Sequence, residues 1–190
     1  MKLDKETEEK LKKEAIKHLE KGKAGWDVPH TLSSVHYMKK LIEYEGGNEK
    51  ILVTTMYLHD IGYPEMKGDY GFDKVMDTKK QHAIIGEQKA EKILRKLDFS
   101  EEEINIIKLL VRKHDELDNI DSKDRQLVME ADSLGQIDYE RCEPTFSKEE
   151  AIKFIKIHFI PDRASRFKTK YGKEIMNKNL DKCKRFLGMS

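Results

Sequence analysis

The apolar residues of this chain recur at intervals of three and four positions, which is the period of an amphipathic helix. Glycine, proline and capping residues separate the periodic segments. The pattern predicts helices at residues 4–21, 30–45, 48–59, 80–97, 100–114, 124–138, 147–158 and 172–187. No alternating strand pattern and no internal repeat is present. We therefore expect an all-α fold, with residues 1–190 forming a single domain.

Several boundaries follow from local chemistry. Ser100 with Glu103, and Ser147 with Glu150, are capping boxes that open helices. Residues 26–29 are expected to form a short extended connector, because the residue before a proline avoids the helical region. Pro161 is expected to end the helix that starts at residue 147. Residues 65–80 contain two glycines and are expected to form a loop that could act as a lid.

Composition and charge narrow the class of protein. The chain is 38% charged and 37% apolar, and its net charge of +1 gives no field that would favour nucleic acid. Residues 163–190 carry nine Lys/Arg against two Asp/Glu, a local charge of +7. The two cysteines form no CxxC motif, the first residues are charged, and no apolar run approaches the ~20 residues of a membrane span. We expect a cytoplasmic protein without a membrane partner, and we do not expect nucleic acid as its partner.

The first chemical feature is the pair His59-Asp60, which follows the apolar run 51–58 and precedes Gly62. At the last turn of a buried helix, an imidazole and a carboxylate can converge on an ion beyond the helix end. Burying a carboxylate without a partner costs several kcal/mol, and a cation would supply that partner. Taken alone, the pair could equally end a helix that Gly62 caps.

Other histidines and one aspartate are further candidate metal ligands. His114 shares a helix face with Ile107 and Leu110, and Asp132 follows the apolar Val128 by four positions, so both are expected to face the core. The remaining candidates are His30 and His82, each near the start of a predicted helix. Each alone could be a hydrogen-bonded core residue. Together, imidazoles and carboxylates from five helices suit Mn, Fe, Co, Ni or Zn.

These residues lie in segments that resemble the successive motifs of the HD-domain metal-dependent phosphohydrolases. The segments are HTLSSV, LHDIGY, QHAIIGE, VRKHDE and EADSLGQID, within residues 26–138. The basic segment FKTKYGKEI is similar to the tail of some bacterial and archaeal members, and the extension spans about 147–188. The resemblance implies an all-α HD-domain bundle of the PDEase type.

The resemblance also implies a ligand set. His30, His59, Asp60 and Asp132 match the positions that hold a metal throughout the family. His82 and His114 match the extra ligands of members with two metals; in single-metal members a histidine there can bind phosphate. The implied cofactor is one or two divalent ions, drawn from Mn, Fe, Co, Ni, Zn and Mg.

The implied reaction is hydrolysis of a phosphate ester by a metal-activated water, with Asp60 as the bridge between two ions. Asp115 is expected to orient the water or to take its proton, with Glu116 as the alternative. Asp115 could equally be a solvated residue at a helix end, and that interpretation is favoured for Glu116.

Contacts to the substrate are expected from basic and aromatic residues. Lys113, or Arg112 in its place, is near His114 and could reach a phosphate. A basic cluster is another candidate, which could also be a solvated face: Arg163, Arg166 and Lys170. The rings of Tyr70 and Phe72 could stack on a base or pack in their own loop.

The expected substrate is a small phosphorylated molecule, with a nucleotide as the leading class. Two other functions fit the same residues. One is a di-iron oxygenase on the same ligand set, and the other is a metal-stabilised module that holds a nucleotide or nucleic acid without turnover. The sequence leaves the substrate, the metal and the oligomeric state open.

Overall fold

The computed structural model describes residues 1–63 and 72–189, and for residues 72–80 it describes the backbone only. The α-helices are α1 (Lys5–Leu19), α2 (Asp27–Glu45), α3 (Glu49–Leu58), α4 (Phe72–Lys96), α5 (Glu101–Lys113), α6 (Lys123–Ile137), α7 (Lys148–Lys153) and α8 (Lys170–Leu187). A π-helix, η2 (Phe154–Arg163), and a short 3-10 turn, η3 (Ala164–Arg166), follow α7. The described residues contain no strand, and the all-α prediction is confirmed.

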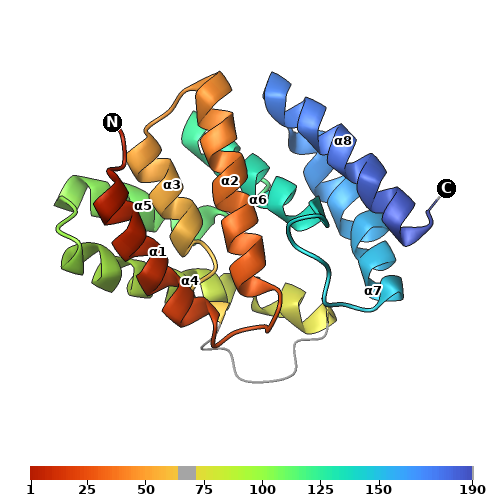
Figure 1. Cartoon of the computed structure of the whole chain (residues 1–190), viewed down its shortest axis with the longest axis horizontal. Coiled ribbons are helices and arrows are strands. Elements are labelled where there is room, and N and C mark those ends of the chain that lie inside the picture. Colours follow the sequence, from red (N-terminus) through yellow and green to blue (C-terminus); the bar gives the residue numbers. More distant parts are fainter. Residues whose placement is uncertain (64–71, 190) are drawn as a thin grey trace.

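Helix α2 runs through the middle of the molecule (Figure 1). It packs along α6 on one side and against α3 on the other, and α5 packs against both α3 and α4. Helix α8 lies over α6 and contacts α7. The arrangement brings the ends of α3 and α5 and the first turn of α2 toward one region beside α6.

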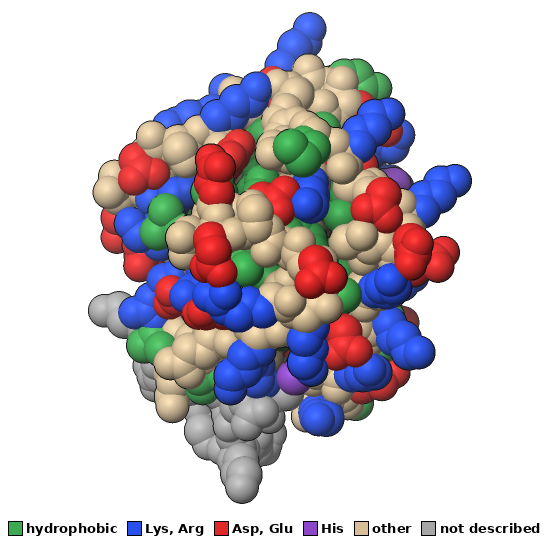
Figure 2. Space-filling view, turned by 90° about the vertical axis from the view of Figure 1, so that its left-hand side faces the viewer, with side chains coloured by type: hydrophobic (Ala, Val, Ile, Leu, Met, Phe, Trp, Pro, Cys, Tyr) green, Lys and Arg blue, Asp and Glu red, His purple; other side chains and the backbone are tan. Residues whose placement is uncertain are grey.

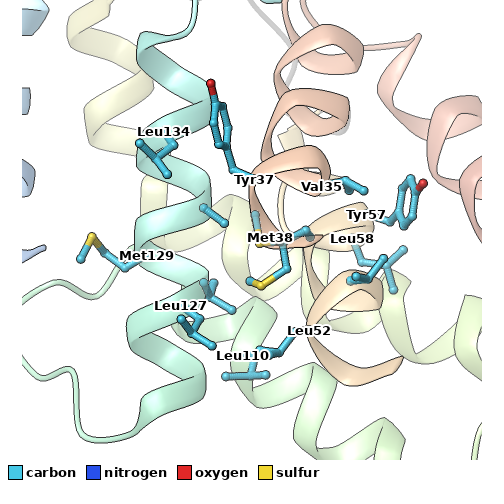
Figure 3. Packing of buried hydrophobic residues seen from close by; sticks show 14 of the residues in the cluster. Val35, Tyr37, Met38, Leu52, Tyr57, Leu58, Leu110, Leu127, Met129 and Leu134 are labelled. Atoms are coloured by element: carbon cyan, nitrogen blue, oxygen red, sulfur yellow. The ribbon is translucent and has the colours of Figure 1, made fainter. Parts of the chain in front are cut away.

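The core is built from the apolar stripes that the sequence predicts. Figure 3 shows Met38 of α2, Leu52 of α3, Leu110 of α5 and Leu127 of α6 in one cluster, and each is at most 4% exposed. Burying one such side chain stabilises a fold by roughly 1.5–3 kcal/mol. The packing of these four helices therefore fixes the positions from which the polar site residues extend.

The prediction of an extended connector at residues 26–29 is wrong, because these residues belong to the start of α2. The helix begins at Asp27, and the backbone of Trp26 is itself in the helical region, with φ −116° and ψ −61°. Pro29 is the third helical residue, where a backbone N–H has no partner within the helix, so a proline costs no hydrogen bond there. Val28 precedes this proline and is nevertheless helical, although the residue before a proline usually avoids the helical region.

Helix α4 is longer than predicted. Residues 65–80 were expected to form a loop, but the backbone is helical from Phe72. No glycine or proline occurs between Gly71 and Gly86 to interrupt it, and the apolar positions 72, 75 and 76 already have helical spacing. The prediction of a loop is therefore wrong for residues 72–80, and residues 65–71 lie outside the part of the chain that the structure describes.

Pro161 does not end its helix, and that prediction is wrong as well. After α7 the chain continues as the π-helix η2, with Pro161 inside it and Arg163 at its end. In an α-helix the proline ring clashes with the carbonyl four residues earlier, whereas hydrogen bonds in a π-helix run five residues back. The wider helix continues past the proline and carries Arg163 into the protein, where it is 3% exposed.

The outer surface carries charge of both signs. Figure 2 shows Lys and Arg interspersed with Asp and Glu over one face of the molecule. In the described parts of the chain, no helix has both the length and the apolar character needed to cross a bilayer.

Candidate metal centre and adjoining pocket

Six potential metal ligands meet between the ends of the core helices. His30 is in the first turn of α2, His59 and Asp60 follow α3, and His82 is in α4. His114 follows α5, and Asp132 is in α6. The four histidines and Asp132 are each at most 4% exposed, and the side chain of Asp60 is 13% exposed. The structure thus brings together all six residues that the sequence singled out.

The first group surrounds one oxygen of Asp60. Its Oδ2 lies 3.4 Å from Nε2 of His30 and 3.3 Å from Nε2 of His59. Oδ1 of Asp132 lies 3.1 Å from the same atom of His30 and 3.6 Å from that of His59. Two imidazole nitrogens and two carboxylate oxygens therefore face one point, which could hold a metal ion.

The second group surrounds the other oxygen of Asp60. Its Oδ1 lies 3.3 Å from Nε2 of His114 and 3.6 Å from Nε2 of His82. Oδ2 of Asp115 lies 3.5 Å and 3.7 Å from the same two nitrogens. Asp60 thus faces two separate clusters of donors with its two oxygens, and Asp115, expected from sequence to handle a proton, lies at the second.

The backbone orients two of the imidazoles. Nδ1 of His59 donates to the carbonyl of Met56 at 2.8 Å, and Nδ1 of His114 donates to that of Val111 at 2.7 Å. A neutral ring with its proton on Nδ1 has a lone pair on Nε2, the nitrogen that faces the group. The ends of α3 and α5 therefore present two nitrogens that could bind a metal, in a fixed direction.

Aromatic rings orient the other two imidazoles. The ring of Trp26 is parallel to that of His30, with centroids 5.6 Å apart and an interplanar angle of 9°. The ring of Tyr63 is parallel to that of His82, at 3.8 Å and 9°.

Two glycines allow the elements to approach closely. A Cβ on Gly62 would lie 1.9 Å from the backbone oxygen of His82, so only glycine fits between Asp60 and α4. A Cβ on Gly135 would lie 2.3 Å from Oγ of Ser34 and 3.3 Å from Nδ1 of His30. These glycines set the distance from α4 to the end of α3 and from α6 to α2.

The electrostatics of the site fit a divalent cation. Burial would lower the pKa of His30, but hydrogen bonds to Asp132 and Asp60 raise it to about 9. Burial is likewise outweighed at His59, whose pKa is raised by Asp60 and Asp132. Burial would raise the pKa of Asp60, but the imidazoles of His59 and His114 hold it well below its usual range. Without a cation, protons shared with the imidazoles balance the carboxylates; a metal ion would replace those protons.

Arg163 links the two groups from outside. Its Nη1 donates to Oδ2 of Asp132 at 2.7 Å and to Oγ of Ser133 at 2.9 Å, and its Nη2 donates to Oδ1 of Asp115 at 2.6 Å. The guanidinium holds the pKa of Asp132 well below its usual range, against the effect of burial. Sequence analysis expected Arg163 at a substrate phosphate; in the structure both of its arms bind carboxylates of the site.

A pocket opens beside the two groups of candidate metal ligands. It is lined by His30, Asp60 and His114, and also by the rings of Trp26, Phe146 and Phe154. A concave pocket with an apolar wall and a few convergent polar groups is the usual form of a small-molecule site.

The other residues expected to contact substrate lie elsewhere. Lys113, Arg166 and Lys170 are not among the residues that line this pocket. Arg166 donates to the carbonyl of Leu117 at 3.0 Å, and Lys170 is exposed at the start of α8. Glu116 is exposed and Arg112 is partly buried. Tyr70 and the side chain of Phe72 lie outside the described residues.

Sequence reasoning missed the two rings that pack on histidines. Trp26 precedes His30 by four positions, a spacing that places both on one helix face, but the misassigned connector hid this relation. Tyr63 follows Asp60 by three positions, and its stacking on His82 depends on the approach of α4, for which the local sequence carries no signal.

Comparison with known proteins gives the family. A family model described as HD domain matches residues 28–136, which is more than half of the chain. No curated protein and no solved structure matched the chain. Members of the HD family bind divalent metals and are in general hydrolases. The match confirms the resemblance that the sequence motifs indicated: this chain belongs to the HD domain family.

Proposed function

We propose that the protein is a metal-dependent phosphohydrolase that works with two divalent ions on a phosphate ester of a small molecule. The observation that carries the proposal is the geometry of Asp60, which turns one oxygen to each cluster of imidazoles. The proposed ligands of the first ion are His30, His59, Asp60 and Asp132, and those of the second are Asp60, His82 and His114.

Bound ions in such a site polarise a phosphoryl oxygen and lower the pKa of a water toward neutrality. The rings of His59 and His114 need no reorientation to bind them, because backbone carbonyls already hold their Nδ1 atoms. Asp115 turns Oδ2 toward the second group while Arg163 holds its Oδ1, and we assign Asp115 to orienting the attacking water and holding its proton.

The test is the variant Asp60→Asn. An amide has one carbonyl oxygen and cannot serve two cations, so we expect phosphate release from a panel of phosphomonoesters to fall by a factor on the order of 10² or more, with metal lost at the same time. The matched control is Asp118→Asn, since the side chain of Asp118 is fully exposed and lies outside the pocket. Activity of Asp60→Asn equal to that of the control would refute the proposal.

Four imidazoles with carboxylates also suit a di-iron centre that reacts with oxygen. Phosphate release without oxygen, with Mn, Mg or Zn as the only metal, distinguishes hydrolysis from this alternative. Oxygen consumption by the iron-loaded protein without phosphate release would favour the oxygenase. Ligand binding without either reaction would favour a binding module. The cytoplasmic location and the single-domain organisation stay predictions.

A further inference from the structure

The residues that line the pocket fall into two sets that differ in chemistry and in origin. The candidate ligands His30, Asp60 and His114 belong to the part of the chain that matches the HD family, residues 28–136. The apolar wall of the pocket comes largely from residues after that part. Its members are Tyr139, Pro144, Phe146, Ala151 and Phe154, joined from the N-terminal side by Trp26.

The wall is held in a fixed position relative to the reaction centre. Arg163, in the π-helix that begins at Phe154, binds Asp115 and Asp132 at 2.6 and 2.7 Å. Phe154 contacts the fully buried Phe159, with ring centroids 6.1 Å apart. The segment that forms the wall is therefore anchored both to the core and to the carboxylates of the metal-binding groups.

Three aromatic side chains line the pocket, and the ammonium of Lys23 lies over the ring of one of them, Phe146, 3.2 Å from its centroid. Trp26, Phe146 and Phe154 line it and are each only partly buried. Phe146 meets the edge of Trp26 at 5.8 Å with an interplanar angle of 63°, and Trp26 covers His30 with one face. Partly exposed rings grouped in a concavity are a site for an apolar group of the ligand. An aromatic group of the ligand would bind there more strongly than an aliphatic group of the same size, because stacked and edge-to-face ring pairs have a favourable interaction free energy beyond that of their buried area.

The geometry points to a phosphate monoester whose alcohol carries a flat aromatic ring, with the phosphate at the metal-binding groups and the ring against Trp26, Phe146 and Phe154. This inference rests on the proposed phosphohydrolase function and adds the class of substrate. The ring can be a hydrocarbon ring or a nucleobase, since the wall recognises its flat apolar face.

Trp26 is the only tryptophan of the chain, so its fluorescence reports occupancy of this pocket. The first experiment titrates the metal-loaded protein with 3-phenylpropylphosphonate and with propylphosphonate, whose C–P bonds resist hydrolysis. We expect the ring-bearing compound to bind about tenfold more tightly. The double variant Phe146→Ala/Phe154→Ala should lose this preference. Phe186→Ala, which removes an exposed ring from α8 outside this pocket, should keep it.

The second readout is kinetic and separates the sources of the ring. KM and kcat for phosphate release are compared between 3-phenylpropyl phosphate and propyl phosphate, and between adenosine 5′-monophosphate and ribose 5-phosphate. Each pair releases a primary alcohol, so a lower KM for the ring-bearing member at similar kcat reports binding of the ring. A preference in the first pair assigns a hydrocarbon ring, and one in the second pair alone assigns a nucleobase; both support the inference.

The inference is overturned if ring-bearing and ring-free compounds bind equally in both pairs, or if the double variant keeps the preference. Hydrolysis of propyl phosphate with no preference for a ring would leave the proposed function standing and reject only the substrate class. No phosphate release from any compound, by protein shown to contain metal, would instead reject the proposed function.

Discussion

Asp60 turns Oδ2 toward His30 and His59 and Oδ1 toward His82 and His114, at distances of 3.3–3.6 Å. Its side chain is 13% exposed, so its charge needs compensation inside the protein. An aspartate has the two separate acceptor atoms that this position needs, and glutamine or asparagine does not. The sequence places Asp60 next to His59, but which oxygen faces which histidine depends on how α4 and α5 pack.

Arg163 is the residue whose role the structure changes most. Replacing it by glutamine removes a guanidinium that binds Asp115 and Asp132 at once. We expect Arg163→Gln to weaken metal binding by about 10–100-fold, because partners that orient a ligand contribute on that scale. Arg163→Lys should restore only part of the loss, since an ammonium cannot span both carboxylates. Calorimetric titration with metal measures the effect, and wild-type affinity in the glutamine variant would contradict it.

At this scale the sequence identified the potential ligands, because their helix faces and their position after apolar runs are local properties. It did not identify what surrounds them. The contact of Arg163 with Asp132 spans 31 positions and that with Asp115 spans 48, and no pattern along the chain indicates either one.

At the scale of elements, the α-helices were predictable where glycines and capping boxes bound them. Both predicted capping boxes are present, at Ser100 and at Ser147. Two of the errors occurred around prolines. Pro29 was expected to keep the residue before it out of a helix, but it lies in the first turn of α2. Pro161 was expected to end a helix, but it lies inside η2. The π-helix needs the surrounding packing to exist, and local sequence does not show it.

Glu130 of α6 holds the start of α8. Its carboxylate is fully buried and accepts the backbone N–H groups of Lys168 and Thr169 at 2.7 and 3.0 Å. We expect Glu130→Ala to lower the free energy of unfolding by roughly 2–4 kcal/mol, because it removes the acceptor of these partly buried N–H groups and of the buried side-chain amide of Gln126. The control is Glu140→Ala, which removes an exposed ion pair with Lys182 and should cost less than about 1 kcal/mol. Urea denaturation measures both, and equal effects would contradict the prediction.

At the scale of the whole molecule, the proposed metal ligands come from α2, α4, α6 and the ends of α3 and α5. Such a site exists only in the folded chain, so a bound ion stabilises the fold as a whole. The sequence indicated that the five helices converge, and the family match supports that reading. The aromatic wall of the pocket was not predictable, because it lies mainly in residues 139–154, outside the motifs.

The same coupling predicts how stability depends on pH. The pKa of His30 rises from 6.5 to about 9 in the folded protein without metal, so its contribution is complete below pH 6.5 and is lost as pH rises to about 9. His59 and His114 shift in the same direction. The pKa values of Asp60 and Asp132 are lowered, so their contribution is lost only in acid, below this window.

In chelator we therefore expect the Tm to fall by roughly 5 °C or more between pH 6.5 and pH 9. Metal competes with protons for the same nitrogens, so the stabilisation by added metal should increase over this interval. Thermal unfolding at both pH values, with metal and with chelator, measures the difference. A metal effect that is constant or decreases with pH would contradict the assignment.

The central claim is that Asp60 lies between two metal ions. The measurement that tests it most directly is the metal content per chain, by plasma mass spectrometry, on protein purified without chelators or a histidine tag. We predict about two equivalents in the wild type and about one in His82→Ala or His114→Ala. One equivalent or less in the wild type, unchanged by either substitution, would contradict the account.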